Sequence, residues 1–434
     1  MDKAVSPNRR PIFAKPQNQE NQASEWSWRK LDINWISTII ILFPPMGVVA
    51  ALVMGIPVRL DTLLVGLIFY AFGGFGITMG YHRLHSHRAY NAHPLLDAVL
   101  AFLGSGAFQG SIKWWARNHR IHHRFIDTEK DPYNAKRGFW WSHLGWMIFK
   151  QNYEELGTAD ISDLTSNKIV MWQHKHYLKL AIFSGIILPT LVCGLFWGDW
   201  MGGYFYAGLL KIFTLHHTTF FINSLAHSPL LGSQNFSKEH TSHDSWICAL
   251  LTFGEGYHNF HHEFAQDYRN GIKWYHWDPA KWMIRLSEMV GLASRLVRIP
   301  NDVIQKNLFE IKHQEHVEAA ETFCKKLEEL DSKTNVEEAW NWTKIQKLVD
   351  EGRKLIILGG LVLDLDKSIP TGEGYTHKNK QINWYQGHPG GKKVLDMYIG
   401  KDATYAFSGG IYKHSIGARN LVNYLKVAKV AASE

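Results

Sequence analysis

Four stretches of this chain are apolar over lengths that match the thickness of a lipid bilayer. They cover residues 33–56, 60–79, 180–197 and 204–222. At a rise of 1.5 Å per residue, a helix of about 20 apolar residues crosses the hydrocarbon core. The first stretch contains Pro44 and Pro45, which predict a kinked helix. The pattern therefore predicts a mainly α-helical membrane domain with four spans over residues 31–300. A further apolar stretch, residues 94–108, is too short to span and predicts a helix at the interface or packed under the others.

Basic residues predict the orientation of these spans. The two short loops between paired spans contain only Arg59, whereas residues 1–30, residues 80–179 and the chain after residue 223 are rich in Lys and Arg. By the positive-inside rule, these three segments and both termini face the cytosol. Residues 1–30 form a polar tail without an apolar core, so no cleavable signal peptide is expected.

Charge and cysteine content exclude several classes of protein. The formal net charge is +8 without a long run of Lys and Arg, which argues against nucleic acid and favours anionic lipid or a phosphorylated substrate. The three cysteines are widely spaced and form no CxxC motif, so a disulfide framework or a cysteine zinc site is excluded. After the apolar runs, residues 301–339 predict a charged helical linker, and residues 340–434 predict a small α+β domain.

Histidine is the most unusual residue of the composition, with 24 copies in 434 residues. Three groups stand out, namely His82-Arg-Leu-His-Ser-His87, His119-Arg-Ile-His-His123 and His258-Asn-Phe-His-His262. In a helix, positions i, i+3 and i+4 share one face, so each His-x-x-His-His motif directs three imidazoles to one point. His82 and His87 would lie about 140° apart on an α-helix, which predicts the end of a helix there.

Imidazole nitrogens suit iron, zinc or copper, and three groups offer more nitrogens than one ion takes. We interpret them as a two-metal site on the cytosolic side; surface histidines near lipid headgroups are the alternative. His85 and His93 are not expected to be ligands. His216 and His217 lie inside the fourth apolar stretch and fit either a cavity lining or structural polarity within the helix bundle. Ordinary polar roles are expected for His143, His174, His176, His276, His313 and His316.

Four strings of the chain resemble the integral-membrane acyl-CoA delta-9 (stearoyl-CoA) desaturases. They are GITMGYHRLHSHRAY, WWARNHRIHHRFIDTEKDPYNAKRGFWWSHLGW, FFINSLAH and TFGEGYHNFHHEFAQDYRNGIKWY. The strings HPGG and GKDATYAFSGGIYKHS resemble a cytochrome b5 domain. A desaturase with cytochrome b5 fused at its C-terminus is typical of the fungal enzymes. The resemblance covers about residues 25–300 and 340–428.

The resemblance implies a di-iron centre held by nine histidines and by one residue that acts through a water. The implied ligands are His82, His87, His119, His122, His123, His227, His258, His261, His262 and, through the water, Asn223. His227 is implied by the resemblance alone. A site made of nitrogens also suits zinc, which overexpressed protein is expected to take up. The hydrogens of an unactivated methylene are not acidic, so a metal centre that uses O₂ fits this chemistry better than a side-chain base.

The implied substrate is a saturated fatty acyl-CoA, whose chain needs an apolar tunnel and whose phosphates need basic residues. The residues expected along the tunnel, with plain core as the alternative, are Tyr70, Trp114, Trp115 and Phe220. The residues that match positions near the CoA head are Arg117, Asn118 and Lys150. Asn118 replaces a residue that is commonly acidic in the family.

The cytochrome b5 resemblance implies haem b with His388 and His414 as axial ligands, and an NADH-cytochrome b5 reductase as electron donor. The segment Asp366–Gln386 is longer than usual, and Lys392 replaces a Glu; both changes are expected to alter the surface presented to the reductase. The family also implies the membrane of the endoplasmic reticulum. Acyl chain length, double-bond position and oligomeric state are left open.

Two other functions are compatible with parts of the pattern. A di-iron lipid hydroxylase uses similar histidine motifs, but NSLAH and the leading His258 of HNFHH favour a desaturase. A histidine-rich zinc transporter would need ligands at mid-membrane on broken helices, whereas these motifs lie outside the predicted spans.

Overall fold

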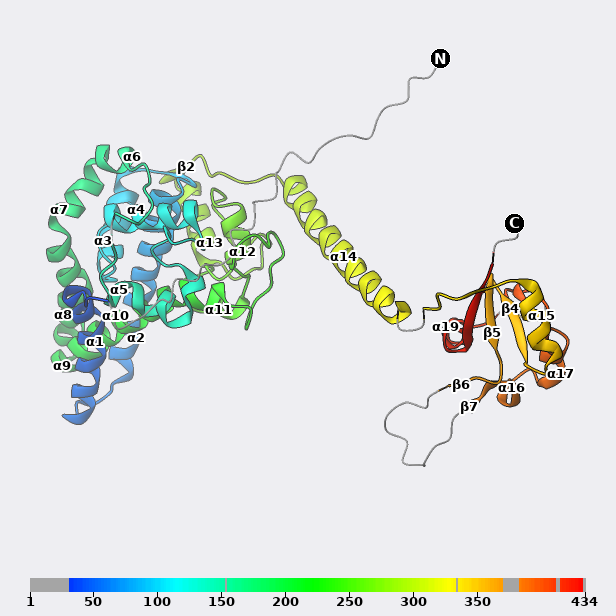
Figure 1. The fold of residues 1–434 in the computed structure, drawn as a ribbon. Coiled ribbons are helices and arrows are strands. Elements are labelled where there is room, and N and C mark those ends of the chain that lie inside the picture. The colour runs from blue at the N-terminus through cyan, green and yellow to red at the C-terminus, as the bar shows by residue number, and fades with distance from the viewer. Residues whose placement is uncertain (1–30, 153, 333–334, 370–381, 411–413, 432–434) are drawn as a thin grey trace, which may run out of the picture. The chain divides into compact units, whose positions relative to one another are not determined.

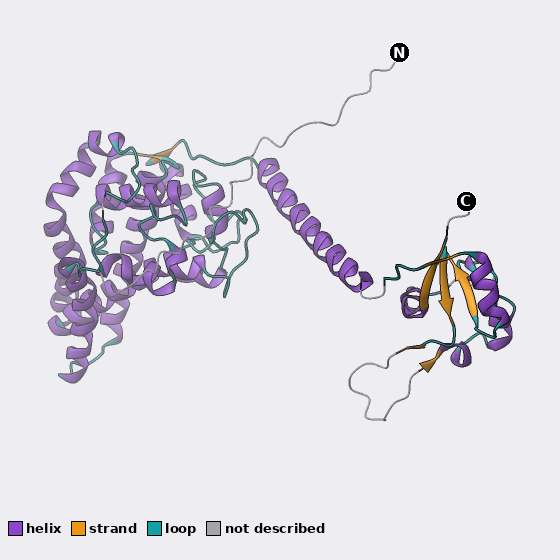
Figure 2. Cartoon of the chain, in the orientation of Figure 1, coloured by secondary structure: helices purple, strands orange, loops and turns teal. Residues whose placement is uncertain are grey.

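The fold is seen in a computed structural model that describes residues 31–152, 154–332, 335–369, 382–410 and 414–431. The predicted polar tail, residues 1–30, lies outside the described residues. The chain divides into two compact units, Met1–Lys312 and His313–Glu434. The first unit is almost entirely helical, and the second contains a four-stranded sheet with short helices (Figures 1 and 2).

Among the described residues, three helices are long and apolar enough to cross a membrane: Trp35–Val53, Leu60–Ser86 and Lys168–Trp197. The first is α1, which keeps Pro44 and Pro45 inside it. The second joins α2 (Leu60–Phe75) to the π-helix η2 (Gly76–Ser86), and the third joins α7 (Lys168–Ile182), η5 (Phe183–Ile187) and α8 (Leu188–Trp197). Many of their apolar side chains point outward and are exposed, as lipid contact requires.

The predicted fourth span, residues 204–222, is not among these three helices. These residues do form a continuous helical stretch, made of α9 (Trp200–Gly202), η6 (Gly203–Leu210) and α10 (Lys211–Ser224), which packs against α1 and α2. Its length suffices, but Lys211, His216 and His217 lower its hydropathy. The third helix also begins twelve residues earlier than predicted, at Lys168 instead of residue 180. Helical turns that contain polar residues precede its apolar part.

The other elements of the first unit cover the ends of these long helices. α3 (Pro94–Ser105) crosses η2 so closely that a Cβ on Gly76 would overlap Gly104, so the predicted interfacial helix packs against the second span. The remaining elements are α4 (Ile112–Phe125), η3 (Ala135–Arg137), η4 (Trp141–Gly145), α5 (Trp146–Ile148), α6 (Ser162–Ser166), η7 (Leu225–His227), α11 (Trp246–Leu251), α12 (His258–Glu263), α13 (Pro279–Met289) and the strand pair β1 (Asn91–Ala92) and β2 (Ala293–Ser294).

A helix of 32 residues, α14 (Asn301–Ser332), occupies most of the predicted linker. The second unit follows, with the sheet order β3-β8-β5-β4 and a separate pair β6-β7. Its strands are β3 (Ala339–Trp340), β4 (Leu355–Leu358), β5 (Leu361–Asp364), β6 (Ser368–Ile369), β7 (Ile382–Asn383) and β8 (Lys426–Val430). Its helices are α15 (Trp342–Asp350), α16 (Trp384–Gly387), α17 (Lys392–Asp396), α18 (Thr404–Phe407) and α19 (Ile416–Leu425). Most of the long predicted segment Asp366–Gln386 lies outside the described residues.

Candidate metal centre

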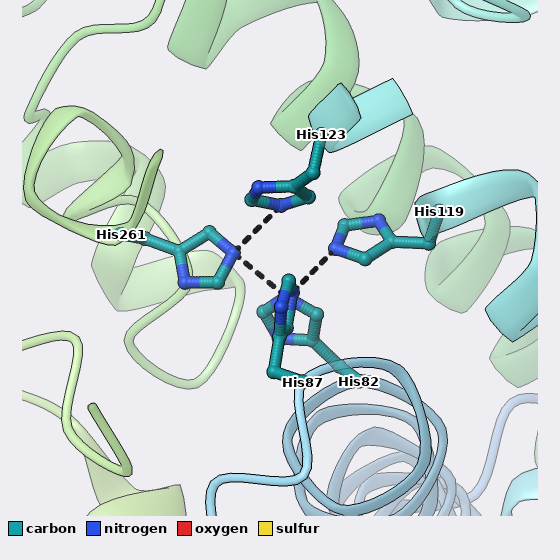
Figure 3. Close-up of side chains that lie close together, drawn as sticks. All are labelled: His82, His87, His119, His123 and His261. Atoms are coloured by element: carbon teal, nitrogen blue, oxygen red, sulfur yellow. Dashed lines mark hydrogen bonds between the residues drawn. The ribbon is translucent and has the colours of Figure 1, made fainter. Parts of the chain in front are cut away.

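Five histidines from three segments converge on one point (Figure 3). They come from η2 and the residue after it, from α4 and from α12: His82, His87, His119, His123 and His261. Their Nε2 atoms are neighbours, with His87 lying 2.9 Å from His119 and 3.1 Å from His82. His261 lies 3.0 Å from both His82 and His123. We call these residues the five-histidine group.

A second group contains the other four predicted histidine ligands: His122, His227, His258 and His262. The Nε2 of His258 lies 3.1 Å from that of His227 and 3.0 Å from that of His262, which is 3.3 Å from that of His122. We call these residues the four-histidine group. α4 and α12 each contribute to both groups, because neighbouring imidazoles of each His-x-x-His-His motif point toward different groups.

The register of η2 explains the five-residue spacing of the first histidine pair. In an α-helix His82 and His87 would point apart, whereas in η2 the amide of His87 donates to the carbonyl of His82, 3.1 Å away, five residues earlier. This π-helical register turns both rings to the same side. Arg120 of α4 holds the end of η2, since it donates to the carbonyls of His85 and Ser86 at 2.6 and 3.1 Å.

The spacing within both groups fits a metal ion. With metal–nitrogen bonds of about 2.0–2.1 Å, two ligands at a right angle have nitrogens about 2.9 Å apart, and two opposite ligands about 4.2 Å. The neighbouring distances match the first value, and all ligand atoms within each group lie within 4.8 Å of one another. Without a cation, several of these nitrogen lone pairs would face one another, which a buried site does not tolerate.

Burial keeps the imidazoles neutral, which ligation requires. Burial and the adjacent imidazoles hold the pKa of His119, His123 and His261 well below the usual value. The same causes lower the pKa of His87, His227, His258 and His262.

Carboxylates behind the histidines fix which ring nitrogen carries the proton. In the five-histidine group, Nδ1 of His82 lies 2.8 Å from Oε2 of Glu255, while Arg83 donates to Oε1 of Glu255 at 2.9 Å. Burial alone would raise the pKa of Glu255, but His82 and Arg83 together lower it to about 2. Arg83 also lies 2.9 Å from Asp278. Nδ1 of His82 therefore carries the proton and leaves Nε2 free as a ligand.

Among the described residues, no Lys or Arg pairs with the carboxylates that support the four-histidine group. Nδ1 of His122 lies 2.9 Å from Asp131, which also accepts hydrogen bonds from the backbone amides of Asp127 and Tyr133. Nδ1 of His227 lies 2.9 Å from Oγ1 of Thr241, whose hydroxyl donates to Asp127 at 2.7 Å. These bonds turn Nε2 of both rings toward the group.

An apolar cavity lies against both groups. His82, His119 and His258 form part of its wall, together with Asn223. Most of the remaining wall is apolar or aromatic and includes Ile41, Ile77, Leu215 and three of the predicted tunnel residues, Trp114, Trp115 and Phe220. Tyr70 does not line this cavity; its hydroxyl donates to the carbonyl of Leu251 at 2.7 Å, and its ring contacts Phe253, which does line it.

A family profile described as fatty acid desaturase matches residues 61–288, just over half of the chain. The matched segment contains all nine histidines of the two groups and most of the cavity wall beside them. The chain belongs to the fatty acid desaturase family. A second profile, described as a cytochrome b5-like haem or steroid binding domain, matches residues 382–431.

Curated relatives of this desaturase include two fungal proteins. The "Probable acyl-CoA desaturase" of Schizosaccharomyces pombe is 43% identical over 95% of this chain and 80% of its own length. The "Acyl-CoA desaturase 1" of Saccharomyces cerevisiae is 41% identical over 93% of this chain and 74% of its own length. The human "Stearoyl-CoA desaturase" is 34% identical over 61% of this chain and 74% of its own length. The two fungal alignments thus extend over most of both units.

The predicted haem ligands of the desaturase lie in its second unit. The ring centroids of His388 and His414 are 6.2 Å apart. With metal–nitrogen bonds of about 2 Å and centroids about 1 Å behind the nitrogens, two imidazoles on opposite sides of one iron have centroids roughly 6 Å apart. Nδ1 of His414 donates to the carbonyl of Phe407 at 3.0 Å, and the two rings stack. This pair therefore fits axial ligation of a haem.

The residues predicted near the CoA head do not line the cavity. Lys150 is exposed and lies 3.8 Å from Asp32, Arg117 is half-buried, and Asn118 is buried. Among the histidines given ordinary roles, His143 is buried and contacts Ser224 and His217, each at 3.0 Å. His85 lies outside both groups and pairs with Asp97 at 2.9 Å.

Sequence reasoning missed the residues that support the ligands. Glu255, Asp131, Asp127 and Thr241 appear in no spacing rule, because they become neighbours of the histidines only after the loops fold. One available signal was that Glu255 precedes His258 by three residues and that Asp131 follows His123 by eight, both inside strings that carry the family resemblance. Acidic residues next to predicted histidine ligands are candidates for this supporting role.

Proposed function

We propose that the protein is an acyl-CoA delta-9 desaturase of the endoplasmic reticulum membrane, which inserts a cis double bond into a saturated fatty acyl-CoA. The observation that carries this proposal is the apolar cavity whose wall includes histidines of both groups. An acyl chain in that cavity would lie beside two metal sites and away from water. The names of the relatives support the acyl-CoA substrate.

The balance of the reaction sets what the protein must deliver. One O₂ takes up two electrons and two protons from the substrate, and two electrons and two protons from outside, to give the alkene and two waters. When bound, two irons would supply the O₂-dependent oxidation of unactivated C–H bonds. We assign His82, His87, His119, His123 and His261 to one iron, and His122, His227, His258 and His262 to the other, with Asn223 through a water.

The chain's own residues orient the substrate and exclude water. Trp115 stacks on His119 with centroids 4.9 Å apart, which fixes the ring of the ligand and places an apolar surface beside it. Gln109, also in the cavity wall, donates to Thr219 at 2.8 Å. The same amide nitrogen also donates to the carbonyl of Leu215 at 3.3 Å, and these two bonds hold the Gln109 side chain in place within an apolar wall. Positioning of this kind determines which methylene faces the metals.

The second unit supports electron delivery. We propose that His388 and His414 would hold haem b, which would supply the electrons of the reaction, with an NADH-cytochrome b5 reductase as their source. α14 tethers the haem unit to the membrane unit, which raises the local concentration of the donor. We also propose that residues 204–222 form a fourth crossing, because an even number of crossings places both termini on the same side of the membrane, as the basic residues predict.

Product analysis tests the activity. Expression in a host that lacks its own desaturase should yield C16 or C18 fatty acids with a cis double bond at carbon 9, detected by gas chromatography and mass spectrometry. An alcohol as the main product would identify a hydroxylase instead. Protein loaded with iron should be active and protein loaded with zinc inactive; equal activity in both would exclude oxidation by the metals.

The electron path needs a separate test. His388→Ala or His414→Ala should remove the absorbance of reduced haem and severely lower desaturation in a host without free cytochrome b5, while the iron content of the membrane unit stays unchanged. Soluble cytochrome b5 in excess should partly restore activity. A chain ending at residue 330 that remains fully active without any cytochrome b5 would contradict the proposed path, although not the desaturase assignment.

A further inference from the structure

The second span exposes large apolar side chains over only part of the length that is needed to cross a bilayer. The exposed ion pair of Arg59 with Asp61 marks one edge of the membrane, where α2 begins at Leu60. Along α2, the last exposed large apolar side chain is Phe72. From Leu60 to Phe72 the helix rises about 18 Å, whereas the hydrocarbon core is about 30 Å thick. About 12 Å of hydrocarbon therefore surrounds a part of this span that other elements cover.

α11 is one of the covering elements, and it lies at the depth of the middle of the second span. The hydroxyl of Tyr70 donates to the carbonyl of Leu251 at 2.7 Å, beside α2 (Figure 1). Phe253, just after α11, contacts the rings of Tyr70 and Phe75. At this depth α11 still exposes large apolar side chains, namely Trp246, Leu250 and Leu251. Water around them would be unfavourable, and at this depth lipid is the surrounding solvent.

α13 lies further along the same span. Its inner face, Ala280 and Ile284, packs in one core with Met79 and Leu100, and Met79 is the residue at which the second span was predicted to end. Its outer face is apolar along one stripe, formed by Trp282, Met283, Leu286, Met289 and Val290. Met289 is 73% exposed. A cytosolic surface helix would place its large apolar residues inward, and α13 does the reverse.

The residues around α13 fit a membrane interface. The segment before it exposes three aromatic side chains, Trp274, Tyr275 and Trp277, of which Trp274 is 83% exposed. Lys273 lies over the ring of Tyr275, and Arg285 borders the apolar stripe. Trp and Tyr gather at the level of lipid headgroups, and basic side chains there reach the phosphates.

We infer that α11 and α13 are embedded in the cytosolic leaflet of the bilayer, α11 in its hydrocarbon layer and α13 with residues 274–277 at the headgroups. The occupant of their exposed faces is lipid. Phe253, just after α11, lines the cavity, and α13 packs in one core with the second span. The leaflet around both helices therefore supports the wall of the candidate metal centre. The inference rests on membrane insertion and not on the desaturase activity, so it can fail while the proposed function stands.

Fluorescence quenching in lipid nanodiscs tests this placement. In a Cys324→Ser background, where the two remaining cysteines are buried, single cysteines are introduced as Leu250→Cys and Leu286→Cys and labelled with bimane. Leu67→Cys, on the exposed face of α2, is the lipid control, and Glu310→Cys, on α14, is the water control. The unmodified background gives the residual labelling.

We expect brominated lipids to quench the probes at residues 250 and 286 to at least half the extent seen at residue 67, with iodide having little effect. Iodide quenching equal to that at residue 310 would overturn the inference. Protection from both quenchers would also overturn it, because a protein surface would then cover the site. If Leu250→Cys or Leu286→Cys is not monodisperse, Trp246→Cys and Met289→Cys give the same readout on the same two helices.

Discussion

The five-histidine and four-histidine groups share α4 and α12 but have different charges behind their ligands. Behind the first group, Glu255 faces Arg83, which also faces Asp278, so the supporting carboxylate has a cationic partner within the protein. Behind the second, Asp131 and Asp127 are buried and receive hydrogen bonds from backbone amides, a hydroxyl and an imidazole. Among the described residues, no Lys or Arg forms an ion pair with either carboxylate, so a bound cation would balance their charge.

This difference indicates a division of roles. The first group is oriented by a carboxylate that Arg83 already pairs, whereas the second gains affinity for a cation from carboxylates that no described Lys or Arg pairs. A buried charge without a partner is costly, so we expect the four-histidine group to depend more strongly on its metal. The following changes test that contrast.

Loss of a ligand should have the largest effect. His261→Ala and His258→Ala remove neighbouring imidazoles of one short helix that belong to different groups. Each should lower product formation at least about a hundredfold and remove one metal of two, because an opened site misplaces the remaining ligands. Metal content by mass spectrometry and product by gas chromatography measure this. The same loss of activity is expected for His119, His122, His123 and His262.

The exposed His313→Ala on α14 is the control for these variants and should change neither quantity. A ligand variant that keeps more than half of the product would have to be removed from its group. If both His258→Ala and His261→Ala lost both metals, the two groups could not be treated as separate sites.

Changes behind the ligands should separate the two groups. Asp131→Asn should weaken metal binding about 10- to 100-fold, in the range known for residues that support a ligand. Glu255→Gln should instead lower the free energy of unfolding by about 3 kcal/mol, because it breaks the buried ion pair between Glu255 and Arg83. Asp278 then remains as the carboxylate that faces Arg83. Chelator titration measures the first effect and thermal unfolding of metal-free protein the second. The comparison breaks if each variant shows the effect expected of the other.

Acidification should destabilise the metal-free protein. Seven imidazoles of the two groups, including His119 and His261, have a pKa lowered in the folded state, so below pH 6.5 the unfolded chain takes up protons that the folded chain does not. Stability is therefore present above this pH and is lost as the pH falls below it, at up to about 1.4 kcal/mol per pH unit for each imidazole. Melting temperatures at pH 7.5, 6.5 and 5.5 check this. A flat or rising profile would contradict it.

The smallest effect is expected at Thr241, which links His227 to Asp127. Thr241→Val removes the hydroxyl and should weaken metal binding at the four-histidine group about fivefold, equivalent to about 1 kcal/mol for one buried hydrogen bond. Thr241→Ser keeps the hydroxyl and should retain wild-type affinity. If both variants weaken binding equally, packing and not the hydrogen bond is responsible.

The sequence predicted the features that depend on local pattern. Three apolar runs gave three long helices, and both His-x-x-His-His motifs reach the metal centre. The prediction that each motif directs its three imidazoles to one point is wrong, since α4 and α12 each divide theirs between the two groups. Contacts between distant segments were not predictable in this way, since Glu255 and His82 are 173 residues apart in the sequence. The π-helical register of η2 was also missed, because no residue pattern in the segment distinguishes it from an α-helix. The predicted fourth span forms a helix that is less hydropathic than the three long ones, because Lys211, His216 and His217 lie in it and the bundle partly covers it.

The π-register of η2 also limits how the first histidine motif can change in length. In that register, residues five apart share a side; in an α-helix, residues four apart do. Deletion of one residue between His82 and His87 could therefore be absorbed by a return to the α-register, with the two rings still facing each other. An inserted residue has no common helical register in which six-apart positions meet. Among variants of this protein, a shortened first motif should thus be tolerated more often than a lengthened one.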